Sequence, residues 1–117
     1  MAIPLMGGMA PAWGPVEALS RSLAAELGPR GIRVVCLRPN AMPETATITE
    51  VFGLHGKGAG ATREQFQALM EGQTLLRRLQ TLTEVADVAA FIASEHASAM
   101  TGTVANPKRR PGCRLAE

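Results

Sequence analysis

The chain contains only two histidines, the side chains best suited to proton transfer near neutral pH. His55 lies in a glycine-rich stretch, and His96 follows Ser94 after one residue. A serine, a histidine and a carboxylate together can attack an ester. Such a triad could draw on Ser94 or Ser98, His55 or His96, and Asp87 or Glu44. Their spacing does not support it, because no Gly-x-Ser-x-Gly elbow is present, and we favour Ser94 and His96 as the end of a helix, where a cation is stabilised.

Metal and phosphate chemistry have less support. Cys36 and Cys113 are far apart, as are the two histidines, so no pair has the spacing of metal ligands and we expect no metal site. The segment GLHGKGAG at 53–60 is rich in glycine, but it follows no predicted strand and opens no helix, as a phosphate loop must. We interpret it as a solvated loop. Tyrosine is absent, which excludes a phenol acid from any mechanism of this chain acting alone.

Composition limits the class of protein further. Hydrophobic residues make up 46% of the 117 residues, as in a globular chain, and no run of apolar residues is long enough to predict a membrane span. The net charge of +2 comes from the last eleven residues, because residues 1–106 contain eight basic and nine acidic side chains. With only 3% aromatic residues as well, we expect no nucleic-acid partner. Two cysteines form no disulfide framework, which favours reduced thiols and a cytoplasmic location.

The first predicted element is a helix at residues 15–27, which Pro15 begins and Gly28-Pro29 ends. Steps of three and four residues place an apolar stripe along it, formed by Val16, Leu19, Leu23 and Leu27. Small residues flank this stripe, namely Ala18, Ser22 and Ala25. A second element could therefore approach this helix closely.

A strand and a loop are predicted next. Residues 31–37 are β-branched and almost continuously apolar, which predicts a strand covered on both faces within a parallel sheet. Residues 39–61 contain two prolines and many glycines and are predicted to form a long loop. Loops of this length in a compact domain are usually functional or disordered.

Two further helices and a second strand are predicted after this loop. Thr62 with Gln65, and Thr81 with Glu84, have the spacing of capping boxes, so each pair marks the start of a helix. Residues 103–105 form a short predicted strand. Residues 107–117 are basic and have no periodicity, and we expect a disordered tail.

The order helix, strand, loop, helix, helix, strand predicts an α/β fold, a partial Rossmann-like, doubly wound unit in residues 1–106. A buried strand needs neighbours on both sides, yet only two strands are predicted, and a two-stranded sheet is marginal in water. The apolar area left uncovered would mark an interface. We therefore expect a homo-oligomer that completes the fold through helix 15–27, or a separate chain that supplies the missing half.

Two runs of sequence resemble the short-chain dehydrogenase/reductase family. VEALSRSLAAELGPRGIRVVCLRP at 16–39 is similar to the segment that follows the family's active-site motif. LRRLQTLTEVADVAAFIASEHASAMTGTV at 76–104 is similar to its closing helix and last strand. The resemblance spans about residues 9–106 and implies the second half of a doubly wound nucleotide-binding fold. It also implies that the first helix pairs across a dimer interface and that the long loop binds substrate.

The resemblance places the family's catalytic tyrosine and lysine at Met9 and Trp13, which cannot exchange a proton near neutrality. The family's Pro-Gly becomes Pro39-Asn40, and Thr45 lies one position from the threonine that contacts the nicotinamide. The substrate pocket implied by the resemblance contains Met9, Trp13, Asn40, Met42 and Thr45. The glycine-rich turn that binds pyrophosphate belongs to the family's first half, and this chain has no such motif.

Three functional hypotheses remain open. The first is a truncated relative of this family that self-associates, binds no cofactor and lacks oxidoreductase activity by itself. The second is an enzyme of another class, such as a hydrolase of small esters, with a pocket between subunits that includes His55. The third is an oxidoreductase that binds NAD or NADP in an unfamiliar way.

Overall fold

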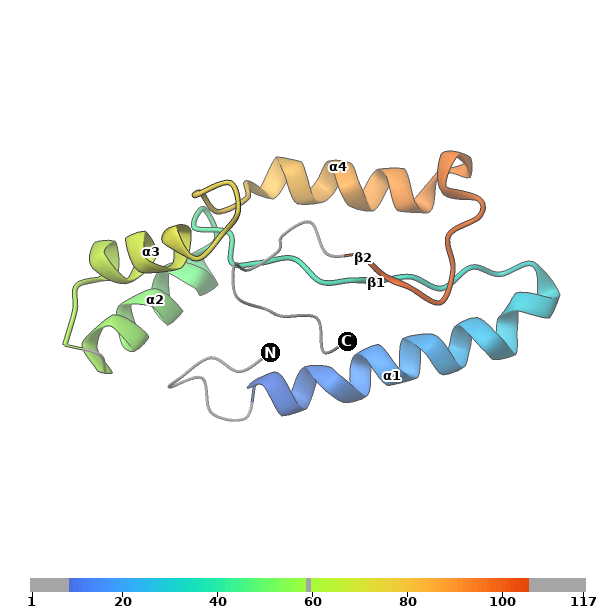
Figure 1. Ribbon diagram of the computed structural model, residues 1–117, viewed down its shortest axis with the longest axis horizontal. Helices are drawn as coiled ribbons and strands as arrows, with labels where there is room; N and C mark the ends of the chain where they lie inside the picture. The colour runs from blue at the N-terminus through green and yellow to red at the C-terminus, as the bar shows by residue number, and fades with distance from the viewer. Residues whose placement is uncertain (1–8, 59, 106–117) are drawn as a thin grey trace. The chain divides into compact units, whose positions relative to one another are not determined.

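The computed structural model describes residues 9–58 and 60–105, and the predicted basic tail 107–117 lies outside them. Short 3-10 helices lie at Gly28–Arg30 and Glu95–Ala97. The elements in chain order are α1 (Met9–Leu27), β1 (Cys36–Leu37), α2 (Ala46–Gly58), α3 (Arg63–Gly72), α4 (Leu82–Ala93) and β2 (Val104–Ala105) (Figure 1).

The described residues form two compact units. The first unit contains residues 9–38 and 86–105, and so holds α1, both strands and most of α4. The second unit contains residues 39–85, with α2 and α3. The protein is thus a mostly helical α/β chain whose two strands belong to one unit.

Helix α1 begins at Met9, six residues before the predicted start, and Pro15 lies inside it. The prediction that Pro15 begins the helix was therefore wrong. A proline inside a helix removes one backbone hydrogen bond. Alanine has the highest helix propensity, and the alanines at 10 and 12 therefore favour a helix that extends before Pro15 despite this loss. The predicted end at Leu27 is confirmed, and Gly31 closes the following turn with a φ of 77°.

The first half of the apolar stripe predicted on α1 is exposed, whereas Leu23 and Leu27 in its second half are half-buried. Val16 and Leu19 are each 58% exposed, whereas Ala24 is buried. Ala24 lies next to the turn before β2, since a Cβ placed on Gly102 would be 3.7 Å from the Ala24 methyl. The side of α1 that packs within the first unit therefore differs from the side that carries the apolar stripe.

Strands β1 and β2 form a two-stranded parallel sheet, with Cys36 opposite Val104. The backbone N–H of Cys36 donates to the Thr103 carbonyl at 3.1 Å. Parallel pairing is thus confirmed. Of the strand predicted at 31–37, only Cys36–Leu37 is confirmed, and the expectation that it is covered on both faces was wrong, because residues 33–37 are only half-buried. Among the described residues β1 has a single neighbouring strand, whereas strands buried on both faces occur inside larger parallel sheets.

Helix α2 occupies most of the predicted loop at 39–61, so the predicted order lacked one helix. Its three glycines lower the intrinsic helix propensity, and packing outweighs that cost. Phe52 is 3% exposed and forms the core of the second unit with Met70 and Leu79. Its ring meets that of Phe66, on α3, edge-on at a centroid distance of 5.4 Å.

Both predicted capping boxes are confirmed. Thr62 Oγ1 accepts the Gln65 N–H at 3.2 Å, and Gln65 Oε1 accepts the Thr62 N–H at 2.9 Å. Thr81 Oγ1 accepts the Glu84 N–H at 3.1 Å, and Glu84 Oε2 accepts the Thr81 N–H at 2.9 Å. Each reciprocal pair satisfies two N–H groups that have no partner inside the helix. Local sequence therefore places the starts of α3 and α4.

Gly56 allows α2 to lie close to the turn before α3. A Cβ at this position would lie 3.0 Å from the carbonyl oxygens of Ala61 and Thr62. We expect Gly56→Ala to lower the free energy of unfolding by about 1–3 kcal/mol, because the backbone must move to admit the methyl. Gly53→Ala is the control, since nothing lies within 4 Å of its Cβ, and it should raise stability by about 0.5–1 kcal/mol. Urea unfolding followed by circular dichroism measures both, and shifts of the same sign would contradict this account.

Candidate functional site

The residues proposed for function divide between the two units. Met9, Trp13, Ser94 and His96 belong to the first unit, and Asn40, Met42, Thr45 and His55 to the second. Met9 begins α1, and its side chain is outside the described part of the structure, while Trp13 lies one helical turn later and is half-buried. The second unit, which contains His55, has no serine. No complete serine–histidine–carboxylate set is thus available within that unit.

Ser94 and His96 lie at the end of α4. The Ser94 hydroxyl donates to the Phe91 carbonyl at 2.7 Å. The same carbonyl also accepts the Ser94 N–H at 3.1 Å, so the hydroxyl adds a second hydrogen bond within the last turn. His96 is exposed in the following 3-10 helix. These contacts fit the interpretation that both residues end a helix.

His55 lies in α2, so the stretch expected to be a solvated loop is helical from residue 53 to residue 58. Residues 53–58 are helical for the same reason as the rest of α2, because this helix packs against α3. The half-buried imidazole stacks on the Phe66 ring, with a centroid distance of 6.0 Å and an interplanar angle of 24°. This contact contributes to packing between α2 and α3.

Asn40 and Gln80 each carry a buried polar atom without a partner among the described residues, Nδ2 of Asn40 and Oε1 of Gln80. The two residues are in contact, because Gln80 Nε2 donates to the Asn40 carbonyl at 2.7 Å. Buried polar atoms without partners are destabilising. The sequence analysis selected Asn40 and missed Gln80, which belongs to no recognisable motif.

Thr45 and Met42 form the turn that precedes α2. The Thr45 hydroxyl donates to the Met42 carbonyl at 2.9 Å and accepts the Ile48 N–H at 3.4 Å. Thr45 is therefore the N-cap of α2. Since the hydroxyl donor is engaged in this turn, the role of Thr45 toward a nicotinamide stays a prediction.

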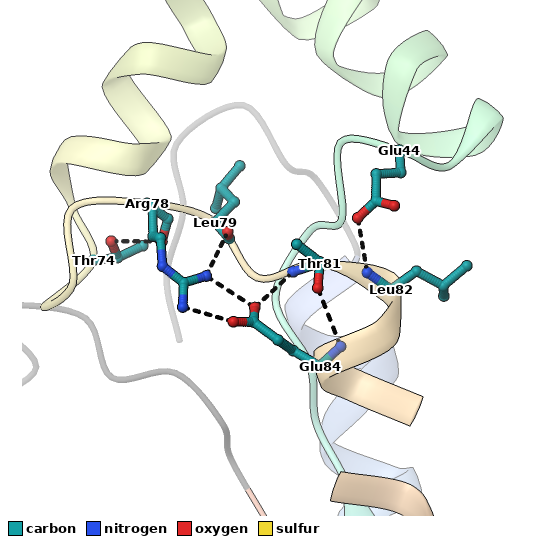
Figure 2. Close-up of polar contacts among 7 residues, drawn as sticks. All are labelled: Glu44, Thr74, Arg78, Leu79, Thr81, Leu82 and Glu84. Carbon is teal, nitrogen blue, oxygen red and sulfur yellow. Dashed lines mark hydrogen bonds and ion pairs between the residues drawn. The ribbon is translucent and has the colours of Figure 1, made fainter. Parts of the chain in front are cut away.

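A polar network joins the segment before α4 to the first turn of that helix (Figure 2). Both guanidinium Nη atoms of Arg78 bind the carboxylate of Glu84, at 2.9 and 2.6 Å. Glu44 accepts the N–H of Leu82 at 2.9 Å. The hydroxyl of Thr74, which is 2% exposed, lies 3.0 Å from the Arg78 carbonyl. The network connects the segment before α4 to the first turn of that helix, and the polar groups named here are paired with one another.

The hydrogen bonds from Arg78 and from the backbone of Thr81 lower the pKa of Glu84 from 4.5 to about 2. A carboxyl group whose pKa is lower in the folded state contributes stability above its unfolded pKa and loses that contribution as the pH falls toward its folded pKa. The contribution of Glu84 is thus present above pH 4.5 and is lost as the pH falls to about 2. We expect Glu84→Gln to reduce the dependence of unfolding free energy on pH across this range, measured by urea unfolding at successive pH values.

Glu64→Gln is the matched control for this pH dependence. The Glu64 side chain is 78% exposed, and its carboxylate lies 3.8 Å from Arg63. Exposed pairs of this kind contribute little to stability. The control should therefore keep the pH dependence of the wild type, and an equal reduction in both variants would contradict the role given to Glu84.

An open hollow of about 420 Å³ lies in the first unit beside β1. It is lined by Arg33, Val35, Leu37, Ala89, Ile92 and Ala93. The Arg33 guanidinium donates to the carbonyls of Ile92 at 2.9 Å and Ser94 at 3.1 Å. A cation in this position satisfies the free carbonyls at the helix end and interacts favourably with the helix dipole. The other lining side chains are aliphatic, so the hollow is suited to packing and carries no reactive group.

Residues 9–58 and 60–105 contain neither a candidate metal site nor a candidate membrane-spanning helix. No group of three His, Cys, Asp or Glu side chains in these ranges is arranged to hold a metal ion. No helix within them is both long and apolar enough to cross a membrane. Cys36 is a half-buried free thiol.

Comparisons with known proteins agree on one family. The family model described as enoyl-(acyl carrier protein) reductase matches residues 1–106. The peroxisomal 2,4-dienoyl-CoA reductase SPS19 of Saccharomyces cerevisiae is 30% identical over 102 residues, which are 87% of this chain and 32% of that protein. The chain thus spans about a third of the length of that curated relative.

Solved structures show the same fold. A short-chain dehydrogenase family protein from Francisella tularensis superposes with a TM-score of 0.81 at 22% identity, over 92% of this chain and 44% of that one. The NAD+-bound xylitol dehydrogenase gives a TM-score of 0.82 at 25% identity, over 92% of this chain and 43% of that one. The chain therefore belongs to the short-chain dehydrogenase/reductase family and corresponds to the C-terminal portion of its members.

Proposed function

We propose that this chain is a self-associating member of the short-chain dehydrogenase/reductase family that does not carry out the family's oxidoreductase reaction by itself. Self-association through α1 would cover apolar surface that the single chain exposes. The lack of activity would follow from the residues at positions 9 and 13 and from the lack of a glycine-rich pyrophosphate turn in this sequence.

The observation that carries self-association is the small core of the first unit. The buried residues described there are the alanines Ala24 and Ala97, whereas Val16 and Leu19 on α1 are each 58% exposed. A unit with two strands and no large buried side chain among its described residues gains little hydrophobic stabilisation by itself. Contact with a second copy along α1 would supply the missing burial.

The sequence around α1 supports the proposal that this chain lacks oxidoreductase activity by itself. The resemblance aligns Met9 and Trp13 with the family's tyrosine and lysine. Neither a thioether nor an indole can donate and recover a proton near neutral pH. Hydride transfer to a carbonyl requires such a proton donor, so we expect no turnover from this chain alone.

Light scattering and a cofactor titration test the proposal together. We expect a molar mass of at least twice the 12.3 kDa of the chain at low micromolar concentration. We also expect no saturable change in the fluorescence of Trp13, the only tryptophan, when NADH or NADPH is added. A mass of 12.3 kDa would contradict self-association, and saturable quenching would contradict the lack of cofactor binding.

Oxidoreductase activity becomes possible if another chain supplies a nucleotide-binding half, and the cofactor would then be NAD or NADP. The family match over residues 1–106 favours this second candidate, because the relatives named above are reductases and dehydrogenases. The relatives' names suggest a CoA thioester or a sugar alcohol as substrate. The hydrolase hypothesis has no comparable observation in its favour, since Ser94 and His55 make structural contacts.

A further inference from the structure

The second unit contains its own hydrophobic core. Its described part is one continuous stretch of chain, residues 39–85. Phe52, Met70 and Leu79 are buried in one cluster, and the partly buried residues packed against this cluster come from the same stretch, namely Ala41, Ile48 and Phe66. The apolar side chains of this core are therefore all supplied by residues 39–85.

Polar contacts join the beginning of this stretch to its end. Gln80 Nε2 donates to the Asn40 carbonyl at 2.7 Å, and Glu44 Oε1 accepts the Leu82 N–H at 2.9 Å (Figure 2). The two ends of the stretch are thus held together by its own groups. Since the cost of closing a loop depends on the chain between the joined residues, the second unit meets this cost with contacts that it makes itself.

The first unit is built differently. It consists of two stretches, residues 9–38 and 86–105, which are separated in the chain by the whole second unit. Long-range contacts join these stretches, such as the hydrogen bonds from Arg33 to the carbonyls of Ile92 at 2.9 Å and Ser94 at 3.1 Å. The contacts that stabilise the first unit are therefore different from those that stabilise the second.

We propose that residues 39–85 form a self-contained cooperative unit, which folds and opens without the first unit and without a second copy of the chain. Proteins open locally in contiguous cooperative units that often coincide with such supersecondary structures. The stretch that the resemblance associates with substrate, residues 39–61, then belongs to a folded helical unit whether or not α1 takes part in self-association. The proposal does not rest on the self-association proposed above.

Helix α4 crosses the boundary between the units, since residues 82–85 belong to the second and residues 86–93 to the first. Each backbone N–H of an α-helix donates to the carbonyl four residues earlier. The N–H groups of residues 86–89 therefore depend on carbonyls of the second unit. Residues 90–93 of α4 and residues 20–27 of α1 report on the first unit alone, and residues 46–58 and 63–72 report on the second.

Hydrogen exchange followed by mass spectrometry tests this independence in the full chain. The double variant Arg33→Ala with Ala97→Asp removes the Arg33 hydrogen bonds and places a carboxylate at a position that is 2% exposed. We expect exchange of residues 20–27 and 90–93 to become faster by roughly tenfold or more. Residues 46–58 and 63–72 should keep the protection of the wild type.

Arg30→Ala with Ala99→Asp is the matched control for this double variant. It makes the same two substitutions at exposed positions of the first unit, so it should keep the wild-type protection of both units. A loss of protection in the second unit on this control would show that the added charge, rather than disruption of the first unit, is responsible.

Phe52→Ala tests whether the second unit opens as a whole. Phe52 is 3% exposed in the core of that unit. We expect α2 and α3 to lose protection together, along with the Leu82 N–H that Glu44 accepts. Loss of protection confined to α2 would contradict a single cooperative unit.

The outcomes separate this proposal from self-association. Loss of protection in residues 46–58 and 63–72 of the variant Arg33→Ala with Ala97→Asp would overturn the proposal, as would their lack of protection in the wild type. Retained protection in that variant, at a dilution where light scattering gives 12.3 kDa, would support folding of the second unit without any partner. A wild-type chain of 12.3 kDa with a protected second unit would overturn self-association and support this proposal.

Discussion

Phe52→Ala should lower the free energy of unfolding by about 3–5 kcal/mol, the typical cost of removing a buried aromatic ring. Phe52 is 3% exposed and packs against Met70, Leu79 and the Phe66 ring. Its loss would leave a cavity between α2 and α3, because the helices on either side can close only partly. We expect the substitution to unfold the second unit at physiological temperature. Urea unfolding followed by circular dichroism measures the change in unfolding free energy.

The same substitution at Phe91 is the control for Phe52→Ala. Phe91 lies in α4 and is 49% exposed. Substitutions at exposed positions usually change stability by only about 0.5 kcal/mol. A cost at Phe91 equal to that at Phe52 would show that burial between α2 and α3 is not what makes Phe52 important.

The double variant Val16→Asp with Leu19→Asp should dissociate the oligomer. Both side chains are 58% exposed on α1, and burial of their carboxylate replacements against a second copy would desolvate two charges without partners. Central interface residues contribute about 2 kcal/mol or more, which corresponds to a dissociation constant raised roughly 30-fold. Light scattering over a dilution series should show the mass falling toward 12.3 kDa at a higher concentration than for wild type.

Leu54→Asp provides a control of matched exposure for the α1 variant. Leu54 is 63% exposed on α2, in the second unit. It should leave the mass unchanged if α1 forms the interface. Equal dissociation by both variants would place the contact elsewhere or show that added charge alone disperses the protein.

Local sequence patterns were sufficient for the features that short segments control. Thr62 with Gln65, and Thr81 with Glu84, have their hydrogen-bonding groups three residues apart, so a helix start follows from the spacing itself. The end of α1 at Leu27 follows from Gly28-Pro29 in the same way. Such features depend on backbone groups within one turn and need no distant partner.

The candidate site could be predicted only in part. Asn40 was selected by its place in a family pattern, but Gln80 is 40 residues away in the chain and carries no motif. In the sequence Arg33 is a single charge in an apolar run, and only the structure shows that it donates hydrogen bonds to carbonyls at the end of α4. A hydrogen bond between residues distant in sequence depends on how the chain folds back, and side-chain type alone does not reveal it.

By itself the sequence determined the family and the helix boundaries set by caps and turns, while the replacement of polar catalytic positions implied by the resemblance stays a prediction. Only the tertiary structure decided that residues 46–58 form a helix, because glycines that disfavour a helix locally are outweighed when Phe52 packs against α3. It also decided that the stripe of Val16 and Leu19 is exposed rather than part of a core. Periodicity shows that a helix has an apolar side, but what covers that side depends on the surrounding chain.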